Sequence, residues 1–474
     1  MLFTSLPFFL FLPVVFIIYW LAKGSVKLQN YILLVASYFF YGWWDWRFCL
    51  LLLFSSSFGF FAGKAIGSTD KETVRKRWMI LSVIVHLGIL CYFKYFNFFA
   101  GSFAEFAGRI GWNLNYIPLN IILPLAISFF TFHILGYTFD VYQKKYKHAD
   151  DYIDFITHIA FFPQLVAGPI ERAGHLLPQF QTKRFLVGSK MEDGLSQMLW
   201  GFFKKIIIAD ALALQVNYVF SHYAELSAIT IALGVIMFVF QMYCDFSGYS
   251  DIALGTARLL GFELLQNFNY PFFSQSMSEF WRKWHMSLSS WINDYLFTPI
   301  SFAKRDWGKW GVLYAAIVSF AISGLWHGAN WTFILWGILQ GVAVGYELIT
   351  KKRRKKMSKQ INPYIYSAVS TGLVFIFWSF TQLVFRSQSI AEFGNIMKRL
   401  FTGGWLEKPE LQLNALFLIL GLLIVERIQI KKPYALQITG LPYFVRWGIY
   451  AAIIILIFSS KNLNNQSEFL YFKF

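Results

Sequence analysis

His327 is the side chain best placed for chemistry in this sequence, because it lies between two apolar segments of membrane length. It belongs to the stretch 323–331, which reads Ser-Gly-Leu-Trp-His-Gly-Ala-Asn-Trp. An ionisable side chain inside a membrane costs roughly 2 to 3 kcal/mol on insertion scales, so it usually faces a bundle interior or a wet cavity and has a function. A neutral imidazole can take a proton from a hydroxyl group. We therefore predict that His327 is a general base; the alternative is a histidine that only hydrogen-bonds a neighbouring helix.

The residues around His327 favour a pocket. Gly324 and Gly328 allow helix backbones to approach closely, and Trp326 supplies a bulky wall beside the imidazole. We expect Trp326 and Asn330 to contact the substrate.

A second histidine, His285, lies in an unusually aromatic and basic stretch, Phe-Trp-Arg-Lys-Trp-His over 280–285. One interpretation is an interfacial amphipathic helix whose cations reach toward lipid headgroups. The other is that Arg282 and Trp284 bind an anionic donor while His285 points into the same cavity as His327. We predict the second, with His285 as a catalytic residue. The residues expected to share one helix face are Trp281, Trp284, His285, Leu288 and Ile292.

A third polar group follows an apolar segment at 245–251, which reads Asp-Phe-Ser-Gly-Tyr-Ser-Asp. Two carboxylates at the end of a membrane span need polar surroundings. They could orient a catalytic histidine or the substrate, with Asp245 as the binding residue, or they could form a polar helix terminus at the cytoplasmic surface. The sequence leaves both interpretations open.

The composition predicts an all-α, polytopic integral membrane protein. Of 474 residues, 57% are hydrophobic and 14% are charged, and the mean hydropathy is +0.49. The formal charge of +17 does not indicate a nucleic-acid partner, because lysine and arginine cluster in short loops between apolar segments, as the positive-inside rule requires. Cys49, Cys91 and Cys244 lie in apolar segments without metal-ligand spacing, so we expect no bound metal.

Counting about 20 apolar residues per tilted helix predicts about twelve crossings in a single domain spanning 1–474. The alternation of basic loops places both termini on the extracytoplasmic side, and the first apolar run is expected to be an uncleaved span. A shorter run over 153–166 is expected to form a re-entrant or partly inserted helix. The predicted spans are 6–21, 28–41, 48–62, 79–99, 117–142, 195–220, 229–244, 312–322, 332–349, 364–385, 411–425 and 445–458.

The six consecutive cations of 351–356 fit a cytoplasmic loop, and they could also attract anionic lipid or the phosphates of a donor. Neither a Walker loop, a dinucleotide-binding GxGxxG after a strand, nor a GxSxG nucleophile elbow occurs in the sequence.

The chain resembles the membrane-bound O-acyltransferase family, and within it the branch of bacterial alginate O-acetylation proteins. The aromatic closing residues 468–474 also resemble the tail of that branch and of teichoic acid D-alanyl transferases. The motifs that carry the resemblance are Phe-Phe-Pro-Gln-Leu-Val-Ala-Gly-Pro at 161–169, 245–251, Asn-Tyr-Pro-Phe-Phe at 269–273, 280–285 and 324–331.

This resemblance implies that His327 is the family's essential histidine and His285 its second polar residue, in a funnel and tunnel where a cytoplasmic acyl thioester meets an outer acceptor. It also implies a bacterial inner-membrane acetyltransferase with no bound cofactor. Its donor would be acetyl-CoA or another acyl thioester, and an extracytoplasmic partner protein would pass the acetyl group to an exported polysaccharide. The alternatives are D-alanyl or other acyl transfer from a carrier protein to a cell-envelope polymer, and a transporter for a lipid-linked sugar.

Overall fold

The computed structural model is all-helical over the residues it describes, which are 1–474 except 113, 115, 167, 461–468 and 471–474. Among the described residues, six helical stretches are long and apolar enough to cross a membrane. Two shorter apolar helices, Leu6–Leu21 and Tyr443–Ser459, accompany them. The all-α membrane class is thus confirmed, whereas twelve crossings stay a prediction. The six helical stretches are Arg47–Gly67, Glu72–Arg109, Ala228–Leu259, Lys309–His327, Trp331–Ser358 and Pro363–Arg386.

The chain divides into two compact units, one of residues 1–194 and 253–265 and the other of residues 195–252 and 266–474. Helices α10 (Gly188–Phe202) and α12 (Ala228–Leu259) each contribute residues to both units. The expectation of one domain over 1–474 stays a prediction.

The first unit is built around α3, which packs against α4, α6 and α7. The Tyr137 hydroxyl of α6 accepts a hydrogen bond from the Ala149 N–H at 3.0 Å, which ties α6 to the loop that follows it. His133 and His158 are buried with 6.4 Å between their ring centroids. Its helices are α1 (Leu6–Leu21), α2 (Val26–Gly42), α3 (Arg47–Gly67), α4 (Glu72–Leu90), η1 (Cys91–Tyr95), α5 (Phe96–Arg109), α6 (Ile127–Tyr142), α7 (Tyr152–Ala160), α8 (Phe162–Leu165) and α9 (Ala173–Gln181).

The predicted span over 117–142 is wrong in its first third. The helix begins only at Ile127, and residues 117–124 form no regular secondary structure. Pro118 and Pro124 explain the difference, because each disfavours a helical conformation in the residue before it. Ala126, with φ of 60°, then turns the chain into α6.

The buried carboxylate of Glu171, which follows α8, links two segments of the first unit by hydrogen bonds. Glu171 Oε2 lies 2.7 Å from His175 Nδ1, and Glu171 Oε1 accepts a hydrogen bond from the Leu265 N–H at 2.5 Å. The hydrogen bond to Glu171 raises the pKa of His175 above its ordinary value of 6.5.

The hydrogen bond between Glu171 and His175 predicts that the stability of the protein depends on pH. The folded state binds the His175 proton more tightly than the unfolded chain does. The stabilisation of the folded protein by protonated His175 is therefore complete below about pH 6.5 and is lost as the pH rises through the folded pKa. We expect the melting temperature in detergent to fall between about pH 6 and pH 8, and to fall less in His175→Gln. Equal slopes in the two proteins would contradict the prediction.

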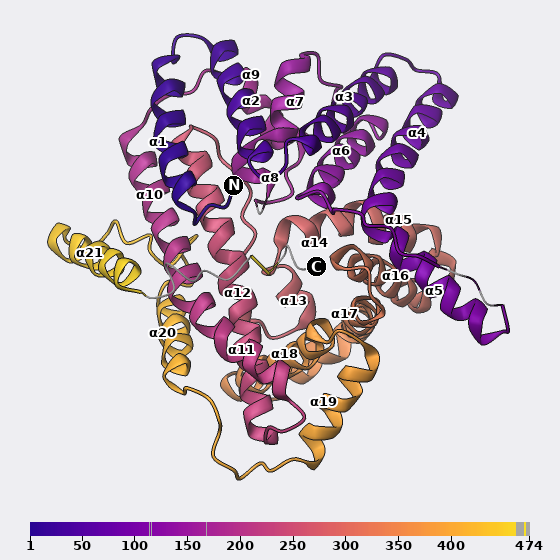
Figure 1. Ribbon diagram of the computed structural model, residues 1–474, viewed down its shortest axis with the longest axis vertical. Coiled ribbons are helices and arrows are strands. Elements are labelled where there is room, and N and C mark those ends of the chain that lie inside the picture. The colour runs from indigo at the N-terminus through magenta and orange to yellow at the C-terminus, as the bar shows by residue number, and fades with distance from the viewer. Residues whose placement is uncertain (113, 115, 167, 461–468, 471–474) are drawn as a thin grey trace. The chain divides into compact units, whose positions relative to one another are not determined.

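The second unit contains the hairpin of α16 and α17, which pack along their lengths, and α18, which packs against α17 (Figure 1). Helix α13 also contacts α17. Its further elements are η2 (Phe203–Ala209), α11 (Asp210–His222), η3 (Pro271–Phe273), α13 (Met277–Trp281), α14 (Met286–Ile292), η4 (Asn293–Phe297), α15 (Thr298–Ala303), η5 (Arg305–Trp307), α16 (Lys309–His327), α17 (Trp331–Ser358), α18 (Pro363–Arg386), α19 (Ile390–Thr402), α20 (Asn414–Ile428) and α21 (Tyr443–Ser459).

Glycines make the α16–α17 hairpin possible. A Cβ atom on Gly337 would lie 2.2 Å from the Phe320 carbonyl oxygen, and one on Gly324 would lie 2.1 Å from that of Phe333. These contacts are to backbone atoms, so a side chain would force the helices apart. The hairpin places His327 at the end of α16, next to the start of α17.

We expect Gly337→Ala to destabilise the protein by about 1 to 3 kcal/mol, because overpacking against backbone cannot be relieved by a rotamer change. Gly372→Ala on α18 is the matched control, since a Cβ there meets no atom within 4 Å. Helix propensity makes the control neutral or stabilising by about 0.5 to 1 kcal/mol. Thermal unfolding in detergent measures both, and the same loss in both variants would contradict the packing argument.

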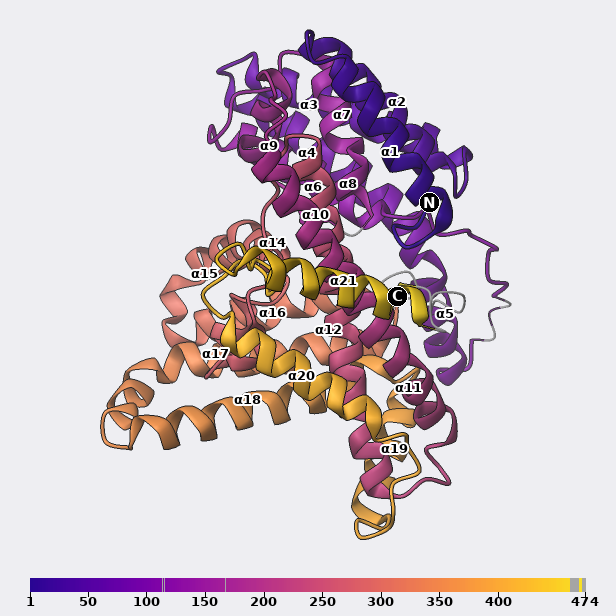
Figure 2. The same cartoon turned by 90° about the vertical axis from the view of Figure 1, so that its left-hand side faces the viewer.

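Helices α10 and α12 approach closely at Gly201 and Gly248, where a Cβ on Gly201 would lie 2.5 Å from the Gly248 carbonyl oxygen. The π-helical turn η2 follows directly after this contact and carries Lys204 and Lys205. Helices α20 and α21, labelled in Figure 2, both contact η2. The two lysines are therefore buried among helices rather than exposed to water.

Candidate active site

His327 is the last residue of α16 and is buried, with 8% of its surface exposed. Gly328, in an extended conformation, ends the helix, and Asn330 begins the next one by accepting a hydrogen bond from the Thr332 N–H at 3.1 Å. The Asn330 amide also donates to the Gln388 carbonyl oxygen at 2.7 Å. These bonds show that Asn330 shapes the junction; its expected contact with substrate stays a prediction.

Aromatic rings hold the His327 imidazole. The ring centroids of Trp326, Trp336 and Phe385 lie 4.7, 5.1 and 5.4 Å from that of His327, in edge-to-face geometry. Such pairs are favourable beyond simple burial. Three different helices thereby fix the orientation of the imidazole.

A narrow cavity adjoins His327, and the part of it open to a water-sized sphere is about 20 Å³. This is room for about one water molecule, so the space accepts a small group and excludes bulk water. The residues that line it are Met242, Asp245, Phe246, Trp284, His327, Trp336, Trp378, Gln382, Phe385, Phe469 and Leu470.

The continuous helix predicted across His285 is wrong. Helix α13 ends at Trp281 and α14 begins at Met286, with His285 at φ of 42° between them. The preceding loop causes the break, because the Asn269 N–H donates to the Lys283 carbonyl oxygen at 2.9 Å and the Met286 N–H donates to the Asn267 carbonyl oxygen at 2.9 Å. The five residues expected on one helix face therefore belong to two helices and the turn between them.

His285 is buried behind the cavity wall. Its ring lies edge-to-face on Phe246 at 4.7 Å and 6.1 Å from the ring of Trp326. Burial lowers its pKa to about 3, so the imidazole is neutral at physiological pH. Its Nδ1 lies 3.3 Å from the side-chain oxygen of Asn267, which also accepts a hydrogen bond from the Ser287 hydroxyl at 2.5 Å. Because that oxygen is an acceptor, Nδ1 carries the proton and Nε2 keeps its lone pair.

Of the expected donor-binding residues near His285, Trp284 lines the cavity, whereas Arg282 is exposed at the end of α13. The structure thus places Trp284 with His327 and leaves Arg282 on the surface of the second unit. Their roles in binding stay predictions.

The segment 245–251 does not end a span, contrary to one of the two interpretations. Helix α12 continues to Leu259, so both aspartates lie within it. Each is paired with a lysine of η2: Lys205 Nζ lies 2.7 Å from Asp245 Oδ1, and Lys204 Nζ lies 2.6 Å from Asp251 Oδ2. The lysine charges make this interior position tolerable for carboxylates, which hydropathy counting cannot foresee.

Asp245 belongs both to a buried cluster of charged side chains and to the lining of the cavity. Lys205 Nζ also lies 2.8 Å from Asp210 Oδ1, and all three side chains are at most 2% exposed. The second oxygen of Asp245 accepts a hydrogen bond from the Leu470 N–H at 2.8 Å. Phe469 packs on Tyr249 with 4.3 Å between ring centroids. Of the aromatic tail singled out in the sequence, 469 and 470 are described and line the cavity; 468 and 471–474 lie outside the described residues.

Sequence reasoning missed Gln382, Trp336, Trp378 and Phe385 as cavity residues. Gln382 had a detectable signal, because a buried amide near the end of an apolar span needs a partner or a function. The aromatic residues had none, since aromatic residues are common throughout this chain.

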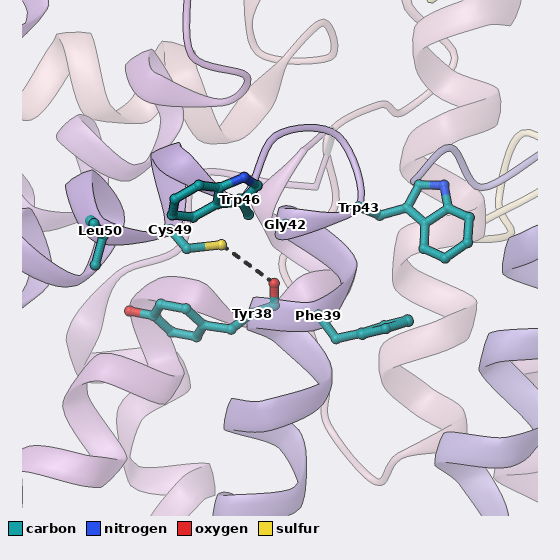
Figure 3. Close-up of a pocket in the computed structure, with 7 residues that line it drawn as sticks. All are labelled: Tyr38, Phe39, Gly42, Trp43, Trp46, Cys49 and Leu50. Atoms are coloured by element: carbon teal, nitrogen blue, oxygen red, sulfur yellow. Dashed lines mark hydrogen bonds between the residues drawn. The ribbon is translucent and has the colours of Figure 1, made fainter.

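A wider hollow lies between α2 and α3, with a volume of about 490 Å³ (Figure 3). Aromatic rings dominate its lining, and the Cys49 thiol donates to the Tyr38 carbonyl oxygen at 3.6 Å. Trp43 and Trp46 at its rim are more than half exposed, as in interfacial aromatic belts. The smaller cavity at His327 is the better candidate for chemistry because it combines a histidine with buried polar groups.

A helical membrane protein with a histidine on the wall of a narrow, largely aromatic cavity is organised as a membrane-embedded enzyme. Comparison with known proteins identifies the kind of enzyme. The model of the MBOAT, membrane-bound O-acyltransferase family matches residues 147–387, a range that includes His285, His327 and Gln382. The chain belongs to this family, and the protein is an O-acyltransferase.

The relatives differ in how much of this chain they match. The probable alginate O-acetylase AlgI of Azotobacter vinelandii is 34% identical over 93% of this chain and 87% of its own length. The peptidoglycan O-acetyltransferase of Helicobacter pylori is 33% identical over 75% of this chain and 72% of its own length. The teichoic acid D-alanyltransferase of Bacillus subtilis is 30% identical over 50% of this chain and 62% of its own length. By their names, the three act on alginate, peptidoglycan and teichoic acid.

Proposed function

We propose that this protein is a bacterial inner-membrane O-acetyltransferase. It moves an acetyl group from a cytoplasmic thioester toward hydroxyl groups of an exported polysaccharide, through an extracytoplasmic partner protein. The observation that carries the proposal is the extent of the similarity: alginate O-acetylases match nearly the whole chain, whereas the D-alanyltransferase matches half of it.

The cavity at His327 supports a direct transfer. The imidazole takes the proton of the acceptor hydroxyl as the oxygen attacks the thioester carbonyl, a role worth roughly 10² to 10⁴ in rate. The aromatic walls keep water away, which protects the thioester from hydrolysis. Because the acyl group arrives already activated on a carrier, positioning and one base are sufficient. An acyl-histidine intermediate would need an extra step.

Thioester consumption in liposomes tests the proposal. Purified protein is given acetyl-CoA or an acylated carrier protein inside the vesicle, and alginate oligosaccharide outside with the candidate partner protein. We expect loss of acetyl-CoA that depends on His327. Consumption of the carrier-bound acyl group alone would replace the proposal by D-alanyl type transfer. Consumption of neither donor by folded protein with partner and acceptor present would overturn the acetyl-transfer proposal.

A further inference from the structure

Three polar side chains on the cavity wall have polar atoms without a hydrogen-bond partner among the described residues. They are the amide of Gln382, at both its nitrogen and its oxygen, and the indole nitrogens of Trp336 and Trp378. The three residues are at most 2% exposed, so bulk water does not reach these groups. All three line the same cavity as His327.

This grouping needs an explanation, because buried polar atoms in native proteins are nearly always paired. Leaving an amide unpaired costs its full desolvation, which selection removes unless the group has another use. A neighbouring glutamine shows that the fold can satisfy such a side chain. Gln340 of α17 is also fully buried, yet its oxygen accepts a hydrogen bond from Trp281 Nε1 at 3.2 Å and its nitrogen donates to Thr381 Oγ1 at 2.8 Å.

The unpaired groups are arranged around the imidazole. Trp378, Gln382 and Phe385 stand at i, i+4 and i+7 of α18, which places them on one helix face. The rings of Phe385 and Trp336 pack on His327 with centroid distances of 5.4 and 5.1 Å. The side chains of Gln382, Trp336 and Trp378 therefore line the space in which His327 works.

We infer that Gln382, assisted by the indole N–H groups of Trp336 and Trp378, binds the carbonyl oxygen of the acyl group and stabilises it during transfer. The inference rests on the proposed function. In the step, the acceptor oxygen forms a bond to the carbonyl carbon and its proton passes to His327. The C–S bond then breaks, and the leaving thiolate takes the proton from the imidazolium. Negative charge appears on the carbonyl oxygen between these events, and fixed donors in a dry site stabilise such charge strongly.

A pair of glutamine variants separates this role from a structural one. Gln382→Met keeps the side-chain length and removes the donor. We expect kcat to fall roughly 10²- to 10³-fold with little change in KM, while the melting temperature stays equal to wild type or rises, because no internal hydrogen bond is lost. Gln340→Met should do the reverse: its melting temperature falls, while turnover per folded protein stays near wild type.

Two further variants test the chemistry of the group. Gln382→Glu has the same shape but places a carboxylate beside the developing charge, so its kcat should be no higher than that of Gln382→Met. Gln382→Asn retains an amide donor and should recover part of the rate. Equal rates in Gln382→Met and Gln382→Asn would count against a donor role.

The inference is overturned if Gln382→Met turns over like wild type, as it would if the amide only binds a water molecule. It is also overturned if Gln382→Met loses as much thermal stability as Gln340→Met, since the amide would then be structural. The thermal measurement needs no substrate, so it can overturn the inference even where the wild type consumes no acetyl thioester. Absence of acetyl-thioester consumption by the wild type would count against the proposed function instead.

Discussion

His327→Ala should lower acyl transfer by roughly 10² to 10⁴ while leaving a folded protein. The imidazole is the titratable ring that lines the cavity, and its removal leaves the hydroxyl of the acceptor without a base. The side chain lies at a helix end among aromatic rings, so its loss removes packing from one side of Trp336 and Phe385 without breaking a helix. Thioester consumption in liposomes measures the rate, and the melting temperature in detergent checks the fold.

His327→Gln is the matched control, because it retains a polar side chain of similar length that cannot take up a proton at neutral pH. It should be as inactive as the alanine variant. A glutamine variant with wild-type turnover would show that His327 only hydrogen-bonds its surroundings. His285→Ala is expected to act less strongly, since His285 reaches the cavity through Phe246 and Trp326. Losses in the double variant that are smaller than the product of the single losses would place both histidines in one step.

Lys205→Met should destabilise the protein by about 3 to 5 kcal/mol. Its ammonium group lies between the carboxylates of Asp210 and Asp245, and all three side chains are buried. Removing the cation leaves two like charges in a low-dielectric interior without a counter-charge, which costs far more than the ion pair itself contributes. Thermal unfolding and the yield of monodisperse protein report the effect.

Lys190→Met is the comparison for this variant. Lys190 pairs with Glu263 at 3.1 Å, but both side chains are about half exposed. Exposed pairs contribute about 0 to 1 kcal/mol, so this variant should melt close to wild type. Similar melting of both lysine variants would mean that the buried cluster is hydrated. Because Asp245 also holds the Leu470 N–H, Lys205→Met should loosen residues 469 and 470 at the cavity as well.

The membrane class, the enzyme family and the position of His327 at a helix junction were predictable from the sequence. Apolar runs of membrane length report burial in lipid directly, since every crossing segment needs about 20 such residues. The motif around His327 predicts a tight junction because glycine and bulky aromatic residues alternate in it. The structure agrees: His327 ends α16, and glycines bring α16 and α17 together.

Each error in the sequence-based description has an identifiable cause. The helix expected from 117 fails at two prolines. The single helix expected across His285 fails because backbone groups of Asn267 and Asn269, 14 to 19 residues earlier in the chain, pair with the turn at Lys283 and Met286. Periodicity describes only neighbours along the chain, so it cannot register a pairing of this kind.

The sequence by itself determined which residue types are available: a histidine between two membrane helices, aspartates after an apolar run, and lysines in a span. Tertiary structure alone decided their partners. It placed Lys204 and Lys205 opposite Asp251 and Asp245, because the close approach at Gly201 and Gly248 brings two distant helices together. It also left Gln382 unpaired beside His327 while it paired Gln340 one helix away. Hydropathy scores these two glutamines identically; whether a buried amide is satisfied depends on the groups that folding places within hydrogen-bond distance.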